Sequence, residues 1–168
     1  MKKLFVIRHA KSSWDNPLIK DFDRPLNNRG EKDAPHMAKR LKERRVFADI
    51  VISSPANRAL TTCKEFCRIL QLHEKNIIIV PMLYQATEDD ILKVVRNIRD
   101  RKGDDDETVF LFGHNSGLTE FVNSLLNEDI DNIPTCGIVC CILKVKTWSE
   151  VTWGAGELDF FDYPKKEN

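Results

Sequence analysis

The sequence predicts an α/β fold of three layers, in which a mostly parallel central sheet has helices on both faces. Short apolar segments of strand length alternate along the chain with longer segments whose apolar residues recur at helical spacing. Such alternation is typical of parallel sheets that are covered by helices on both sides. Ligands bind sheets of this kind at the carboxyl ends of the strands.

The individual elements follow from the same two patterns. Five apolar segments are expected to form strands, and VTWGAGEL is a weaker sixth candidate: 4–7, 50–52, 77–80, 109–112, 138–145 and 151–158. Four segments with helical periodicity lie between them: 33–44, 55–72, 89–101 and 118–126. Because only a short linker joins the last two strands, we expect them to form an antiparallel pair at one edge of the sheet.

Two of the helix starts are set by prolines. Pro35 is tolerated only in an opening turn, so Asp33 is expected to be the N-cap of the first helix; if the helix begins earlier, a kink is expected at Pro35. Ser54 is expected to cap the second helix, with Pro55 as its first residue. Arg58 would then lie about one turn into this helix, near the positive end of its dipole.

Length and charge limit the classes of function. The chain has 168 residues, which suits one domain over residues 1–168. It carries 26 basic and 26 acidic side chains, so neither a nucleic acid nor a membrane is indicated as a partner. The opening MKKLFVIRH has too short an apolar run for a signal peptide, and no segment approaches the roughly 18 apolar residues of a membrane span. We therefore expect a cytoplasmic protein.

The cysteines indicate neither disulfides nor a metal. Five cysteines are an odd number in a chain without an export signal, so a disulfide framework is not expected. The sequence has no CxxC pair with a nearby pair of histidines, which a zinc site would need. We expect no metal and no cofactor.

Basic side chains follow three of the predicted strands. Arg8 and His9 follow the first strand, and His114 follows the strand at 109–112. Arg58 lies near the start of the helix after the second strand. Four such groups at one sheet edge would repel one another unless an anion lies among them. A phosphoryl group fits best, because guanidinium groups bind its oxygens in pairs and the start of a helix attracts it.

Four motifs carry a resemblance to a known family. RHA at 8–10, DFDRPLNNRG at 21–30, SSPANRALTT at 53–62 and GHN at 113–115 resemble the histidine phosphatase superfamily, the phosphoglycerate-mutase-like group. RHAKSSW followed by DFDRPLNNRG is most similar to its short SixA-type phosphohistidine phosphatase branch. The resemblance extends from residue 4 to about residue 145, and it implies a phosphoglycerate-mutase-like fold.

The resemblance also implies roles for four residues. His9 would be the nucleophile that becomes phosphohistidine, while Arg8, Arg58 and His114 would bind the transferring phosphoryl group. His9 must then present one neutral ring nitrogen, and a hydrogen bond from its other nitrogen to a backbone carbonyl would fix the tautomer. His114 is expected to be protonated. No metal is needed, because the cationic side chains would take over its electrostatic role.

The general acid is less clear. Glu88, in LYQATEDDI, is the candidate, since this segment occupies the place from which larger members of the family supply a carboxylate. The alternative is that Glu88 or Asp89 only opens the helix as a cap or a dipole partner. A substrate whose leaving group is imidazole would lessen the need for an acid, because protonated phosphohistidine departs as a neutral ring.

Three further residues are candidates for substrate binding. Arg24 could reach the mouth of the pocket, as the resemblance suggests, or form a salt bridge with Asp21 or Asp23 that shapes the loop. Ser12 could donate to phosphate, as could its neighbours in the sequence. Asn115 could be a ligand or a helix cap.

One departure from the family pattern concerns residue 10. Ala10 stands where many superfamily members have glycine, so its backbone must adopt a conformation open to residues with a Cβ atom.

The sequence thus predicts a phosphatase, a hydrolase that acts through phospho-His9. The expected substrate is phosphohistidine on a protein partner such as a phosphotransfer domain, since a chain without a large lid implies an open, shallow pocket. The alternatives are a phosphatase for small phosphate esters and a non-catalytic module that binds phosphorylated protein.

Overall fold

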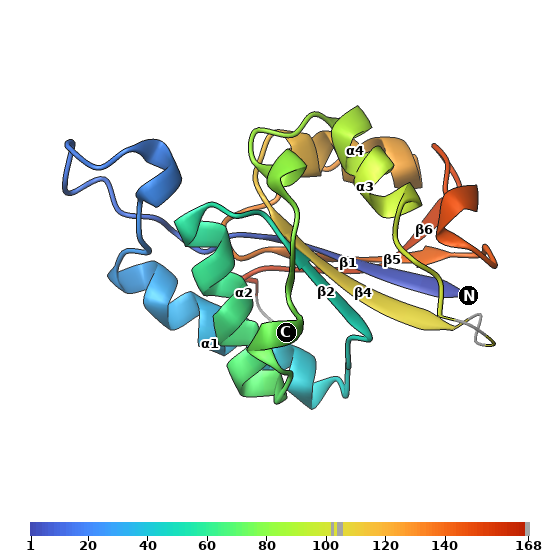
Figure 1. Ribbon diagram of the computed structural model, residues 1–168, viewed down its shortest axis with the longest axis horizontal. Helices are drawn as coiled ribbons and strands as arrows, with labels where there is room; N and C mark the ends of the chain where they lie inside the picture. The colour runs from blue at the N-terminus through green and yellow to red at the C-terminus, as the bar shows by residue number, and fades with distance from the viewer. Residues whose placement is uncertain (102, 104–105, 167–168) are drawn as a thin grey trace.

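The structure, a computed structural model, describes residues 1–101, 103 and 106–166. Strands and α-helices alternate along most of the chain (Figure 1), with these bounds: β1 Lys2–Arg8, α1 Asn28–Glu43, β2 Ile50–Ser53, α2 Asn57–Leu70, β3 Ile78–Ile79, α3 Glu88–Arg96, β4 Glu107–Gly113, α4 Gly117–Leu126, β5 Ile138–Leu143 and β6 Gly156–Asp162. Four short 3₁₀ helices lie between them: η1 Asp21–Asp23, η2 Glu74–Asn76, η3 Pro81–Leu83 and η4 Trp148–Glu150.

The six strands form one sheet in the order β3-β2-β4-β1-β5-β6. The first four strands in this order are parallel, β5 runs antiparallel to β1, and β6 runs antiparallel to β5. The predicted mostly parallel sheet with an antiparallel pair at its edge is confirmed.

Helices cover both faces of the sheet, as predicted. Helices α1 and α2 lie on one face and α3 and α4 on the other (Figure 1). Alternate side chains of β4 point to opposite faces, so Phe110 and Phe112 pack with α1 and α2, whereas Leu111 packs with α3 and α4. This double burial explains why the strand is a continuous apolar run. None of the described helices is both long and apolar enough to cross a bilayer.

The first helix corrects the prediction. It begins at Asn28 and not after an Asp33 cap, because the Asn27 side chain caps it by accepting a hydrogen bond of 2.9 Å from the Gly30 N–H. Pro35 therefore lies inside the helix, where it cannot donate the hydrogen bond to the carbonyl of Glu31. The sequence prediction gave the proline too much weight as a start signal.

Three other boundaries also differ from the prediction. Helix α2 begins two residues after Pro55, with Ala56 as its N-cap. Helix α3 ends at Arg96, because the amide of Asn97 donates to the Lys93 carbonyl and closes the last turn. The last strand is β6, which begins five residues after the start of the predicted segment 151–158, since Gly154 turns the chain with a φ of 77°.

Candidate active site

Strand pairing places the two histidines side by side. Arg8 on β1 is in register with Gly113 on the neighbouring parallel strand β4, so His9 and His114 follow at the same sheet edge. The His9 N–H donates to the Gly113 carbonyl at 3.1 Å, and the two imidazole ring centroids are 5.1 Å apart. The structure thus brings together two residues that are 105 positions apart in the sequence.

His9 is neutral and in a defined tautomer. Its Nδ1 atom donates to the Ala10 carbonyl at 2.7 Å. Burial lowers the pKa of His9 to about 3; the hydrogen bond to Ala10 opposes this shift, and the charges of Arg58 and Arg8 add to it. At neutral pH the lone pair is therefore on Nε2, which is the state that a nucleophilic imidazole requires.

His114 is held by Ser54: its Nε2 atom shares a hydrogen bond of 2.8 Å with the hydroxyl of Ser54. Burial, followed by the charge of Arg58, lowers the pKa of His114 to about 4 in the absence of a bound anion. The expected protonation of His114 beside a phosphoryl group stays a prediction. Ser54 thus bonds His114 and is not the N-cap of α2 that the sequence predicted. Its oxygen also accepts from the Ala56 N–H at 3.2 Å.

Both arginines have side-chain nitrogens that no protein group satisfies. Arg8 donates to the Ile133 carbonyl at 2.9 Å, and Arg58 donates to the Asp21 carbonyl at 2.7 Å. Yet Nε of each arginine, together with Nδ1 of His114, is buried without a hydrogen-bond partner; within the described residues these are the three such side-chain atoms. Buried polar groups are nearly always paired. All three of these exceptions belong to the residues that the sequence singled out as an anion site.

Asp21 is the residue that the sequence reasoning underestimated. Its carboxylate forms an ion pair with Arg58 at 3.2 Å and accepts hydrogen bonds from the Tyr84 hydroxyl at 2.6 Å and from Arg24 Nε at 3.2 Å. The hydrogen bond from Tyr84, followed by the charge of Arg58, lowers the pKa of Asp21 to about 2. A carboxylate thus lies against two guanidinium groups of the site. The sequence showed Asp21 only as a possible partner of Arg24.

Thr62 on α2 was also missed. Its hydroxyl oxygen accepts from the Ala10 N–H at 3.0 Å, and the hydroxyl donates to the Arg58 carbonyl at 2.8 Å. The loop after β1 is therefore fastened to the helix that carries Arg58. Ala10 is fully buried and is not among the described residues with positive φ, so a Cβ atom is tolerated there. The sequence feature that could have indicated this contact is that Thr62 follows Arg58 by four positions, which is one helical turn.

Arg24 and Ser12 are joined by a hydrogen bond between their side chains. Arg24 Nη1 donates to the Ser12 hydroxyl at 2.7 Å, and its guanidinium stacks on Trp14 at 3.5 Å from the ring centroid. Both Arg24 and Ser12 are buried. The predicted salt bridge between Arg24 and Asp21 is present at 3.2 Å. Ser12 thus positions Arg24, and a contact of either residue with substrate stays a prediction.

Asn115 and Glu88 have partners outside the group of histidines and arginines. The N-cap of α4 is Ser116 and not Asn115. The Asn115 oxygen accepts from the Thr119 N–H at 3.3 Å, and its amide donates to the Ile133 carbonyl at 2.9 Å. Glu88 is the first residue of α3 and accepts from the Ser124 hydroxyl on α4 at 2.8 Å. Its role as a general acid stays a prediction. Among the described residues no group of three or more metal-ligating side chains is found.

The α/β fold thus places two imidazoles and two guanidinium groups at one edge of its sheet. The family model described as "Histidine phosphatase superfamily (branch 1)" matches residues 4–84. This match covers just under half of the chain; it agrees with the resemblance that the motifs predicted, and it supports a phosphatase.

Two groups of relatives are similar in sequence. An uncharacterised chloroplastic protein of Arabidopsis thaliana is 29% identical over 89% of this chain and 70% of its own. A 2,3-bisphosphoglycerate-dependent phosphoglycerate mutase of Bifidobacterium longum is 39% identical over 36% of this chain. That alignment spans 25% of the mutase and leaves most of the mutase unmatched.

Solved structures share the fold over nearly the whole chain. A phosphohistidine phosphatase SixA structure from Agrobacterium tumefaciens has a TM-score of 0.81 and 24% identity, and it covers 96% of this chain and 97% of its own. The protein histidine phosphatase SixA in complex with tungstate has a TM-score of 0.76 and 21% identity, with 96% of each chain covered. At these identities the likeness establishes a shared fold.

Proposed function

We propose that this protein is a metal-independent phosphatase that removes phosphate from phosphohistidine on a protein partner through a phospho-His9 intermediate. The observation that carries the proposal is the set of three buried, unpaired nitrogens on Arg8, Arg58 and His114, gathered around a neutral His9. A phosphoryl group offers oxygens to such donors and a phosphorus atom to the imidazole.

The reaction takes place in two displacements. In the first, the lone pair of His9 Nε2 attacks phosphorus, and the bond between phosphorus and the substrate nitrogen breaks, so that the substrate imidazole, which carries a proton on its other nitrogen, leaves with that electron pair as a neutral ring. In the second, water attacks phospho-His9, the new P–N bond breaks, and inorganic phosphate leaves with the two protons of that water. His9 is then neutral again, and the oxygen that entered came from water.

His114 and the arginines take the electrostatic role. Burial and the positive charge of Arg58 keep His114 neutral, and a bound phosphoryl dianion acts on its pKa in the opposite direction. Binding of substrate thus favours protonation of His114 beside the phosphoryl oxygens. The fixed positive charges of Arg8 and Arg58 stabilise the charge that develops in the transition state, which is the task that a metal ion performs in other phosphatases.

Two considerations favour phosphohistidine as the substrate. The Glu88 carboxylate accepts a hydrogen bond from the Ser124 hydroxyl. Asp21, with a pKa of about 2, is a poor proton donor at neutral pH. A substrate whose leaving group departs as a neutral imidazole needs an acid less than an alkyl phosphate does. The names of the two SixA structures with this fold point to the same substrate. A cytoplasmic location belongs to this proposal.

The test compares two substrates and three proteins. Release of inorganic phosphate is measured from a phosphotransfer domain that carries phosphohistidine and from para-nitrophenyl phosphate, with the wild type, His9→Ala and His36→Ala. We expect turnover of the phosphohistidine protein, a loss of at least about 10³-fold in His9→Ala, and wild-type rates in His36→Ala, because His36 is exposed on α1. A label on His9 that is labile in acid and stable in base would identify the intermediate.

The other outcomes separate the alternatives. Turnover of the ester alone would favour the small-molecule phosphatase. Binding of the phosphorylated protein without turnover of either substrate would favour the non-catalytic module and would contradict the proposal.

A further inference from the structure

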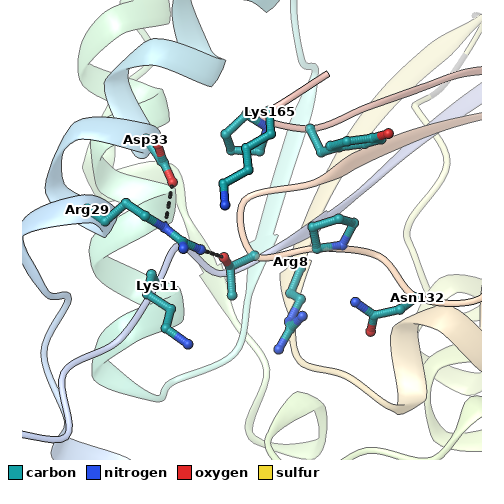
Figure 2. Close-up of a pocket in the computed structure, with 10 residues that line it drawn as sticks. Arg8, Lys11, Arg29, Asp33, Asn132 and Lys165 are labelled. Carbon is teal, nitrogen blue, oxygen red and sulfur yellow. Dashed lines mark hydrogen bonds and ion pairs between the residues drawn. The ribbon is translucent and has the colours of Figure 1, made fainter. Parts of the chain in front are cut away.

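A basic pocket opens beside Arg8. It has a volume of about 420 Å³ and is lined by four cationic side chains (Figure 2): Arg8, Lys11, Arg29 and Lys165. Asp33 is the one carboxylate among its lining residues, all of which the structure describes. The chain as a whole has a net charge of zero, so an excess of three positive charges around one pocket is a local feature.

The backbone fixes two of these cations next to each other. The Asn27 N–H donates to the Lys11 carbonyl at 2.9 Å, where α1 begins. Gly30 lies so close to the same carbonyl that a Cβ atom at this position would overlap with it. The segment that carries Lys11 is therefore packed against the first turn of α1, which carries Arg29.

Contacts of Arg40 position the segment that carries the fourth cation, Lys165. Arg40 forms an ion pair of 2.8 Å with Asp162, the last residue of β6, and donates to the carbonyls of Tyr163 at 3.0 Å and Pro164 at 3.2 Å. These contacts bind the segment after β6 to α1, so that Lys165 extends over the pocket toward Arg29 (Figure 2).

The charge of this pocket is only partly compensated within the protein. Arg29 contacts Asp33 at 3.5 Å and donates to Thr135 at 3.0 Å. Exposed basic side chains usually do no more than interact with solvent. Here, however, the cations surround a concavity, and one of them, Arg8, also belongs to the phosphoryl site. A ligand held at His9 thus has a second group of cations next to it.

We propose that this pocket binds a carboxylate that the substrate carries beside its scissile phosphoryl group. The proposal rests on the proposed function for the position of the phosphoryl group. Two sources share this chemistry: an acidic side chain next to phosphohistidine on a protein partner, and the carboxylate of a small phosphate ester. Charge complementarity of this kind selects among substrates and depends on ionic strength.

The test measures binding, so it does not depend on turnover. In a His9→Ala background, calorimetry compares 3-phosphoglycerate with glycerol 1-phosphate, which differ by a carboxylate in place of a hydroxymethyl group. A second pair consists of peptides with a non-hydrolysable phosphohistidine analogue flanked by Asp or by Asn. We expect the acidic member of at least one pair to bind about tenfold more tightly at low salt, with a smaller ratio at high salt.

Two sets of substitutions assign the preference to the pocket. Arg29→Gln combined with Lys165→Gln should bring the ratio close to one, whereas Lys39→Gln, an exposed lysine on the same helix, should leave it unchanged. The pair that shows the preference identifies the source of the carboxylate.

Equal binding within both pairs, or a preference that survives in the double variant, would overturn the inference. Absence of turnover in the wild type would contradict the proposed function but not this binding ratio, and absence of binding of all four ligands would overturn both.

Discussion

At the scale of single residues, the Asp21 carboxylate is paired with Arg58, an arginine of the proposed phosphoryl site. One of its carboxylate oxygens lies 3.2 Å from Arg58 Nη2 and accepts a hydrogen bond from Tyr84. A phosphoryl group that binds through Arg58 therefore competes with this carboxylate and also meets its negative charge. The backbone carbonyl of Asp21 holds Arg58 Nη1 independently of the side chain.

Replacing this carboxylate should strengthen anion binding. Asp21→Asn keeps an oxygen that can accept from Arg58 but removes the negative charge. We expect the dissociation constant for inorganic phosphate to fall about three- to tenfold at low ionic strength, and the effect to shrink with added salt. Isothermal titration calorimetry at two salt concentrations measures both effects.

The matched control is Asp23→Asn, an exposed carboxylate in the same 3₁₀ helix. It should change phosphate affinity by much less than Asp21→Asn. If Asp21→Asn weakened phosphate binding instead, then the charge of Asp21 would be needed to orient the arginines, and the competition argued above would be wrong.

Residues on neighbouring strand ends could be found from the sequence, whereas contacts between loops could not. The positions of Arg8, His9 and His114 follow from two apolar strands that end at the same sheet edge. The contact between Asp21 and Tyr84 joins residues 63 positions apart in two loops. No periodic pattern records such a contact, so its discovery required coordinates.

At the scale of elements, α2 is fastened to the loop after β1 through one hydroxyl. Thr62 bonds the Ala10 N–H and the Arg58 carbonyl, so it couples the backbone next to His9 with the start of the arginine-bearing helix. Thr62 is fully buried, and water cannot replace it as a partner.

Thr62→Val should therefore cost stability. Valine has nearly the same shape but leaves the buried Ala10 N–H without an acceptor, and an unsatisfied buried group of this kind costs about 1–3 kcal/mol. Urea unfolding monitored by circular dichroism measures the free energy of unfolding. Thr61→Val, at the adjacent exposed position, is the control and should stay within about 0.5 kcal/mol of the wild type. Equal losses in both variants would show that the Thr62 bond contributes no specific stability.

Most of the elements were predictable, because the central strands β1, β4 and β5 are buried on both faces and contain continuous apolar runs. The boundaries were predicted less well where tertiary contacts override local signals. Pro35 reads as a helix start, yet the cap at Asn27 and the packing of α1 on the sheet accommodate it seven residues inside the helix. Ser54 reads as a cap, yet its hydroxyl bonds His114 on another element.

At the scale of the whole molecule, the fold brings together charges that would otherwise repel one another. Arg8 and Arg58 lie close enough for the charge of Arg58 to lower the pKa of Arg8, in addition to the effect of burial. Packing of the sheet and its two helix layers must hold these groups in place. That chain segments from residue 8 to residue 114 form one site agrees with a single domain over 1–168, which stays a prediction.

The same arrangement makes the stability of the protein sensitive to pH. His9 and His114 have pKa values of about 3 and about 4 in the folded protein, below the ordinary 6.5. At a pH between the folded pKa of each histidine and the ordinary value of 6.5, the unfolded chain binds protons that the folded protein excludes. The free energy of unfolding therefore falls as the pH falls. The loss begins near pH 6.5 and continues to about pH 4 for His114 and to about pH 3 for His9. Asp21, with a pKa of about 2, contributes a loss only below about pH 4.

Acidification from pH 7 to pH 5 should therefore cost about 2 kcal/mol for each of the two buried imidazoles. Urea titrations at pH 7, 6 and 5 measure this slope for the wild type and for His9→Gln combined with His114→Gln. The double variant lacks both groups, so its free energy of unfolding should change less with pH than that of the wild type, by up to about 4 kcal/mol over this range. Parallel slopes for the two proteins would mean that both imidazoles accept protons in the folded state. In that case burial would not hold the pKa of His9 below its ordinary value, contrary to the lowered pKa argued above for the neutral imidazole.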